Sequence, residues 1–164
     1  MEARAMEIHT YTDGAARGNP GPSASGYAIY DKSEKLLARM FFSNGRQTNN
    51  VAEYLAIIAA LKKVWEEFGS KAELTLFSDS RLVVNQLSGN YKVKDVNLKK
   101  LHKEAMAIAA KLSKCKFVDL PRENPQISMV DGKLNELLDN IKKDESDIVA
   151  IRKAREGEQK GLFG

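Results

Sequence analysis

Five segments of the chain are rich in apolar, β-forming residues, in places with a period of two, and this pattern predicts five strands. Polar turns separate the first three segments, which favours an antiparallel meander for that part of the chain. The predicted strands cover residues 6–13, 26–30, 35–43, 72–78 and 116–120.

Three longer stretches repeat apolar residues every three or four positions, which predicts amphipathic helices, and residues 80–87 are typical of a shorter one. The long helices are expected over residues 48–65, 98–112 and 130–141. Thr48 or Asn49 can cap the first of them. Counting by three and four from Glu53 leads to apolar residues, so this carboxylate is expected on the buried stripe. Asp131 shares the apolar stripe of the last helix in the same way.

The order of these elements predicts an α/β fold with a five-stranded mixed sheet, three strands antiparallel and two parallel, flanked by helices. The helix over 48–65 would act as a crossover, so the strands ending at Asp13 and Asp79 should be parallel neighbours. Sites in such sheets lie beyond the carboxyl ends of the strands. We expect one domain over residues 6–143, followed by a charged helical extension or tail over 144–164.

The composition limits the classes of protein and of metal site that this chain can form. The chain has 164 residues, 43% of them hydrophobic, which is enough for one core. No stretch is typical of a signal peptide or a membrane span, so we expect a soluble, cytoplasmic protein with no membrane contact. A lone Cys115 and two histidines argue against a disulfide or a zinc site, so any metal would be held by oxygen.

Four carboxylates fall where the predicted fold would bring them together: Asp13, Glu53, Asp79 and Asp131. Such a cluster is costly unless cations compensate the charge. Hard divalent cations suit ligands that are all oxygen, so we expect Mg²⁺, with Mn²⁺ as an alternative. Two ions about 3.5–4 Å apart can activate a water and stabilise the leaving oxygen of a phosphodiester.

Positive charge is concentrated between Tyr91 and Lys116, where eight lysines stand against two acids. A local excess of this kind is expected of a protein that binds a phosphate backbone. A solvated helix face explains any single one of these lysines equally well.

Several motifs together resemble ribonuclease H of type 1: TDGAARGNPGP, GRQTNNVAEYLAIIAAL, FSDSRLVVNQL and PRENPQISMVDGKLNELL. The chain is most similar to the archaeal and some bacterial members, which lack the basic protrusion, because the stretch between Ser88 and Leu112 is too short for that extra helix. The resemblance implies an endonuclease that cuts the RNA strand of an RNA–DNA hybrid and leaves 5′-phosphate and 3′-hydroxyl ends.

The resemblance also implies residue roles. The four carboxylates would be the metal ligands, with Asp13 bridging two ions. Asn19, Asn49 and Asn50 would contact the minor groove, where amides can bond ribose 2′-hydroxyls. Arg46 and Thr48 match a phosphate pocket for the DNA strand, although a turn arginine and a helix cap explain them as well. Among the lysines, Lys99, Lys100 and Lys103 would supply part of the role of the missing protrusion.

One departure from the family pattern concerns the loop before Asp131, where many relatives carry a histidine that is thought to help product leave. This chain has Arg122, Glu123 and Asn124 there and no histidine. If that loop lies over the metals, Glu123 is the nearby side chain able to shuttle a proton or loosen a metal. Pairing of Glu123 with a surface cation is the simpler alternative.

Other functions fit parts of the same pattern. A broader nuclease of this superfamily would also cut RNA duplexes, and a non-catalytic module would bind the hybrid without cutting it. A small-molecule phosphatase would use the metals but not the asparagines and lysines. We expect a monomer. The ending Gln159 to Gly164 faintly resembles a sliding-clamp-binding peptide, with its usual aromatic pair missing.

Overall fold

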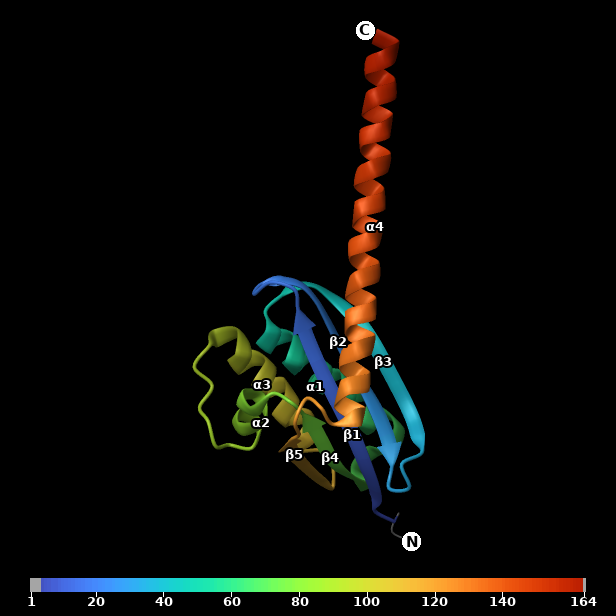
Figure 1. The fold of residues 1–164 in the computed structure, drawn as a ribbon. Coiled ribbons are helices and arrows are strands. Elements are labelled where there is room, and N and C mark those ends of the chain that lie inside the picture. Colours follow the sequence, from blue (N-terminus) through green and yellow to red (C-terminus); the bar gives the residue numbers. More distant parts are fainter. Residues whose placement is uncertain (1–3, 164) are drawn as a thin grey trace.

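The computed structural model describes the backbone of residues 4–163 and the side chains of residues 4–158 (Figure 1). Three consecutive strands come first along the chain, and helices and the two remaining strands follow them. The elements are β1 (Met6–Ala16), β2 (Gly21–Asp31), β3 (Leu36–Gln47), α1 (Asn49–Phe68), a short 3-10 turn (Gly69–Lys71), β4 (Ala72–Ser78), α2 (Arg81–Leu87), α3 (Val96–Ala109), β5 (Lys114–Asp119) and α4 (Pro125–Phe163).

The five strands form one mixed sheet in the order β3-β2-β1-β4-β5. β1, β2 and β3 are antiparallel neighbours, whereas β4 pairs parallel to β1 and β5 pairs parallel to β4. The predicted fold class, with three antiparallel strands and two parallel ones, is therefore confirmed. α1 is the crossover that makes β1 and β4 parallel neighbours.

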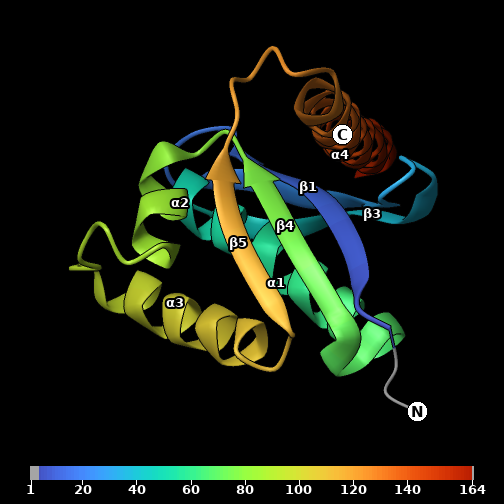
Figure 2. The same ribbon diagram turned by 90° about the horizontal axis from the view of Figure 1, so that it is seen from below.

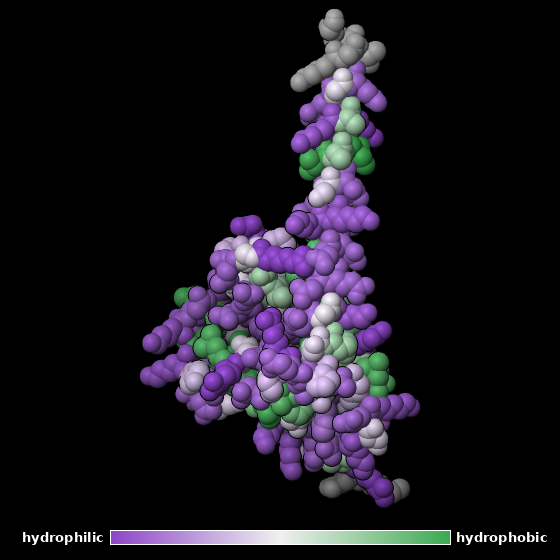
Figure 3. Space-filling view, viewed as in Figure 1, coloured by the Kyte–Doolittle hydropathy of each residue, from purple (hydrophilic) through white to green (hydrophobic). Residues whose placement is uncertain are grey.

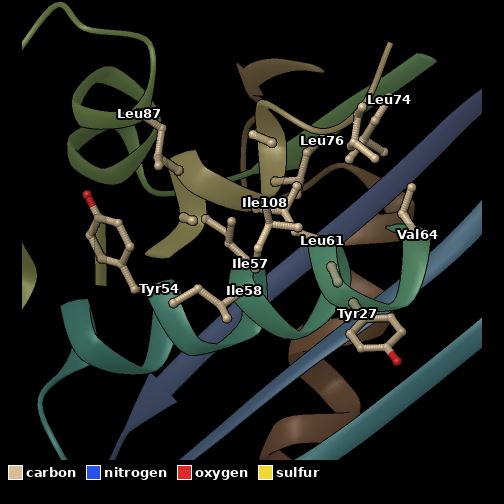
Figure 4. Close-up of a cluster of buried hydrophobic side chains, with 14 of the residues drawn as sticks. Tyr27, Tyr54, Ile57, Ile58, Leu61, Val64, Leu74, Leu76, Leu87 and Ile108 are labelled. Carbon is tan, nitrogen blue, oxygen red and sulfur yellow. The ribbon is translucent and has the colours of Figure 1, made fainter. Parts of the chain in front are cut away.

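Helices cover both faces of the sheet (Figure 2). α1, α2 and α3 pack on one face, where the larger core forms around residues such as Ile57, Leu61 and Leu76, all fully buried (Figure 4). The first part of α4 packs on the other face through Leu134 and Leu138. Each helix is fixed by its apolar stripe, as the period of the sequence indicates.

Two predicted boundaries near the site were wrong. β1 does not end at Asp13 but continues to Ala16, because the hairpin with β2 keeps pairing as far as Ala16 opposite Ser23. The last helix begins at Pro125, several residues earlier than expected. Asn124 starts it, accepting hydrogen bonds from the backbone N–H groups of Gln126 (3.0 Å) and Ile127 (3.2 Å).

The connection between α2 and α3 is short. It covers residues 88–95 and contains no further helix, so the chain lacks the basic protrusion, as its sequence indicated. Asp95 caps α3 by accepting a hydrogen bond from the Leu98 N–H at 2.9 Å.

α4 runs far beyond the sheet and projects away from it (Figure 1). Every described side chain from residue 142 to residue 158 is exposed. The boundary expected at residue 144 falls inside this helix and stays a prediction. Within the described residues, no helix combines the length and the apolar character needed to cross a bilayer.

Candidate active site

The sheet brings two of the candidate carboxylates to the same level. The parallel ladder between β1 and β4 ends at the pair Tyr11 and Phe77. Asp13 and Asp79 each lie two residues beyond that pair, so both side chains sit at the carboxyl end of the sheet. This is the edge at which a mixed α/β sheet offers a crevice.

A glycine lets α1 approach this edge closely. A Cβ on Gly14 would lie 2.3 Å from the carbonyl carbon of Ala52 and 2.4 Å from the nitrogen of Glu53, far inside contact distance. On the neighbouring strand, the Ser25 hydroxyl donates a hydrogen bond to the Ala52 carbonyl at 2.6 Å. The first turns of α1 are therefore held against β1, which places Glu53 beside Asp13.

Asp13, Glu53 and Asp79 form a tight cluster, in which one oxygen from each lies within 4.8 Å of the others. Asp13 is only 3% exposed and Glu53 only 7%. Burial, followed by the charge of Asp79, raises the pKa of Asp13 to about 8. Burial also raises the pKa of Glu53 well above its usual range, and the charges of Asp13 and Asp79 add to the effect.

The donor set fits a hard divalent cation. Glu53 Oε2 is buried and has no hydrogen-bond partner among the described residues, a costly state for a carboxylate oxygen. Burial raises the pKa of Asp79 too, although the charge of Arg122 opposes the shift. Three oxygen donors with suppressed ionisation are the arrangement that a bound cation would relieve.

Asp131 lies near this cluster but outside its tightest part. It is on the second turn of α4, partly exposed, with its Oδ1 3.8 Å from Arg122 Nη2. Asn135 Nδ2 donates to Asp131 Oδ2 at 3.3 Å. All four carboxylates line one cavity of about 450 Å³. The structure thus brings the four together at one cavity, with three in mutual contact range.

Four polar residues that line this cavity were not among the predicted site residues: Arg17, Ser80, Arg122 and Asn135. Arg17 lies in the β1–β2 turn and pairs with Asp139 of α4 at 2.6 Å. It also donates to the carbonyl oxygen of Asn135 at 3.2 Å. A signal for Asn135 existed in the sequence, since it lies four positions after Asp131 on one helix face. No local pattern marked Arg17, whose place depends on the packing of α4 over the hairpin.

The predicted asparagines gather at the start of α1. Asn49 Oδ1 accepts a hydrogen bond from the Ala16 N–H at 2.8 Å, and Asn19 Oδ1 accepts one from the Asn49 N–H at 3.2 Å. Asn50 lines the carboxylate cavity and also a second hollow, which Asn19 and Thr48 line with it. The amide nitrogens of Asn19 and Asn49 are not used in these bonds and can donate outward.

The other predicted residues lie farther from the carboxylates. Thr48 caps α1, accepting a hydrogen bond from the Val51 N–H at 3.3 Å, and its contact with a phosphate stays a prediction. Arg46 is exposed at the end of β3. Three of the lysines, Lys99, Lys100 and Lys103, are exposed on α3. Nothing in this placement tests their proposed contacts.

Glu123 is exposed in the link before α4, and among the described residues lining the cavity this link supplies Arg122 instead. The proton-shuttle role of Glu123 therefore stays a prediction without support from its position. The clamp-like ending from Gln159 lies outside the residues whose side chains are described.

Comparison with known proteins places this chain in a family. Residues 11–130 match the family model described as reverse transcriptase-like. The ribonuclease HI of Halobacterium salinarum is 35% identical over 137 residues, which are 84% of this chain and 67% of the relative. A bifunctional protein of Mycobacterium tuberculosis is 37% identical over 118 residues, covering 71% of this chain but 32% of the relative. The chain thus spans about a third of that mycobacterial protein.

Solved structures agree. The N-terminal RNase H domain of the mycobacterial protein superposes with a TM-score of 0.79 at 32% identity, over 86% of this chain and 99% of that domain chain. RNase H1 of Halobacterium salinarum gives 0.76 at 34%, over 82% and 98%. A compost-derived RNase H1, solved in complex with an RNA/DNA hybrid, gives 0.75 at 38%, also over 82% and 98%.

Proposed function

The chain belongs to the type 1 ribonuclease H family, in the form without the basic protrusion, and on that premise we propose that it cuts the RNA strand of RNA–DNA hybrids. The observation that carries the proposal is the convergence of Asp13, Glu53 and Asp79, with the buried Glu53 Oε2 lacking any partner among the described residues. The relative solved with an RNA/DNA hybrid supports the choice of substrate.

The cofactor we propose is Mg²⁺, as two ions, with Mn²⁺ as a substitute. Asp13, Glu53, Asp79 and Asp131 would hold the ions, and Asp13, at the centre of the cluster, would contact both. When bound, such a pair activates a water on one side of a phosphodiester and stabilises the leaving oxygen on the other. The products would be 5′-phosphate and 3′-hydroxyl ends.

Two contacts within the chain favour the ionised form of these buried carboxylates. The backbone N–H of Gly14 donates to Asp13 Oδ1 at 2.9 Å, which orients that carboxylate. Arg122 lies 3.8 Å from Asp131, and its charge opposes the rise that burial causes in the pKa of Asp79, so it partly compensates the cluster. We infer that Arg122 and Asn135 position Asp131 at the cavity.

Recognition of the RNA strand is assigned to the asparagines at the start of α1. The amide oxygens of Asn19 and Asn49 are engaged with backbone N–H groups, which fixes the side chains and leaves their N–H₂ groups free to donate. Asn50 stands between the carboxylate cavity and the second hollow. Donors fixed beside the reaction centre can bond a ribose 2′-hydroxyl, the group that DNA lacks.

Contacts to the sugar-phosphate backbone of the hybrid are assigned to residues farther from the carboxylates. We propose that the exposed Arg46 binds a phosphate of the DNA strand, and the hydroxyl of Thr48 can still donate while it caps α1. The exposed Lys99, Lys100 and Lys103 would add electrostatic affinity without sequence preference. Glu123 is retained as a proposed aid to product release.

Labelled substrates test the proposal: hybrid, RNA duplex, DNA duplex and a small phosphate ester, each with Mg²⁺, Mn²⁺ or chelator. We expect metal-dependent cleavage of the RNA strand in the hybrid alone. Equal cleavage of RNA duplex would favour the broader nuclease, and tight hybrid binding without any cleavage would favour the non-catalytic module. Turnover of the small ester instead of the hybrid would contradict the proposal.

A further inference from the structure

The outer part of α4 carries an apolar patch that touches no other described element. Ile148, Val149 and Ile151 are 49%, 48% and 54% exposed. Figure 3 shows hydrophobic residues on the projecting helix, bounded by hydrophilic residues on either side along the helix. Large apolar side chains grouped on an otherwise polar helix mark an interaction surface.

This part of α4 gains little from ion pairs along its own length. A helix that is polar on most sides needs ion pairs three or four positions apart, and isolated helices of this length are marginal. The available spacings join the charges on either side of the patch to flanking residues, such as Lys143 with Asp147 and Arg152 with Glu156, and not to each other. Among the described side chains, none of these acids and bases forms an ion pair.

The charges around the patch are separated by sign. The acids Asp144, Glu145 and Asp147 precede it, and we call them the acidic block. The bases Arg152, Lys153 and Arg155 follow it and form the basic block. A surface with an acidic half, an apolar centre and a basic half is complementary to itself after a half-turn rotation.

We propose that this surface binds a second copy of the same chain, with the two α4 helices antiparallel and the twofold axis passing between Val149 and Ala150. Ile148 then lies level with Ile151 of the second copy, and each acidic block lies level with the other copy's basic block. A parallel pair would set acid against acid and base against base, which opposes association. The antiparallel dimer replaces the monomer expected from the sequence.

Individual pairs agree with this axis. Asp144, Ile148, Ile151 and Arg155 share one helix face at four- and three-residue spacing, so Asp144 comes level with Arg155 of the second copy on that face. Leu138, the last α4 residue at the carboxylate cavity, precedes Ile148 by ten residues, or about 15 Å of helix. The contact therefore lies apart from the active site, and the chemistry on a short hybrid does not depend on it.

Molar mass in solution tests the dimer. The full chain has a mass of 18.2 kDa, and we expect light scattering to approach twice that value as concentration rises at low salt. Because the core of the contact is small and its flanks are ionic, added salt at about 0.5 M should return the protein to monomer. A mass that stays at one chain over the whole concentration range at low salt overturns the proposal.

Two charge-reversal variants make the test specific. One changes Asp144 and Asp147 to Lys and leaves Glu145, which lines a hollow with Arg46, unchanged, and the other changes Arg152, Lys153 and Arg155 to Glu. Each variant alone should be monomeric, because all blocks then repel, whereas an equimolar mixture should restore a particle of doubled mass. A dimer that persists in either variant alone, or no recovery in the mixture, contradicts pairing of the blocks. Single-turnover cleavage of a short hybrid should match the wild type and serves as the control for folding.

A disulfide test fixes the direction of the helices. In a Cys115→Ser background, Asp144→Cys and Arg155→Cys are made in separate chains, one of them carrying a mass tag. Antiparallel pairing predicts a cross-link between the two different chains only after mixing. Cross-links between identical chains before mixing would instead establish a parallel pair and overturn the proposed axis.

Discussion

Replacing Asp13 by asparagine should stabilise the cation-free protein at neutral pH, even though it removes a proposed metal ligand. Burial and the charge of Asp79 raise the pKa of Asp13 to about 8, from an ordinary value of 3.8. A carboxyl group whose pKa is raised by folding stabilises the folded state while it is protonated. That stability is fully present below the ordinary pKa and is lost as pH rises toward 8.

The size of the effect follows from this shift. Each pKa unit corresponds to about 1.4 kcal/mol, so the raised pKa of Asp13 lowers the free energy of unfolding by up to roughly 1.5 kcal/mol near pH 5 and roughly 4 kcal/mol near pH 7, relative to low pH. Side chains around the protonated carboxylates can relax, which reduces the penalty, so these two values are upper bounds. An asparagine avoids this penalty, so Asp13→Asn should gain about 2 kcal/mol at pH 7, or roughly 4–8 °C in Tm.

Thermal and urea unfolding in chelator, from about pH 5 to pH 8, measure the gain. Asp119→Asn is the matched control, because Asp119 ends the neighbouring strand β5 but is exposed. The advantage of Asp13→Asn should grow with pH and shrink when Mg²⁺ is added, since bound cation stabilises the wild type more. A variant that is less stable than the wild type in chelator at pH 7, or a gain independent of pH, would refute the reasoning.

Three further predictions concern packing, binding and turnover. Gly14→Ala should cost about 3 kcal/mol of stability, because the added Cβ would clash with the α1 backbone. It should also weaken Mg²⁺ binding, measured by calorimetry. An unchanged Tm would contradict the close approach of α1 to Gly14. Reversing Lys99, Lys100 and Lys103 to Glu should weaken hybrid affinity and reduce its salt slope by roughly 0.9 per lost phosphate contact, whereas an unaltered slope would make these lysines a solvated face. Glu123→Gln should slow multiple turnover more than single turnover, and equal effects in both regimes would end its assignment to product release.

Much of the fold could be predicted because the signals were local. The period of apolar residues located α1 and β4, and the crossover rule made β1 and β4 parallel neighbours. The end of β1 was misplaced because Gly14 and Gly18 are typical of turns, whereas pairing with β2 extends the strand to Ala16. Pairing with a distant strand overrides a local preference of this kind.

The residues of the site likewise divide into those that local sequence signals locate and those that only packing brings to the cavity. Asp13 and Asp79 could be located because each directly follows an apolar, β-forming run, and the parallel register of β1 and β4 then brings the two together. Arg17 and Arg122 reach the cavity only through the packing of α4 and its preceding link over the β1–β2 hairpin, which no local pattern encodes. The antiparallel charge pattern of α4 was present in the sequence, but its meaning depends on the helix standing free of the sheet.

The measurement that tests the central claim most directly is single-turnover cleavage of a labelled RNA–DNA hybrid by Asp13→Asn, Glu53→Gln, Asp79→Asn and Asp131→Asn, each confirmed to be folded. If the carboxylates act through bound cations, wild-type protein should cut the RNA strand with Mg²⁺ and stop in chelator. Each variant should then lose most of the cleavage rate. Wild-type rates in the Asp13 or Asp79 variant, or cleavage that continues in chelator, would contradict the account.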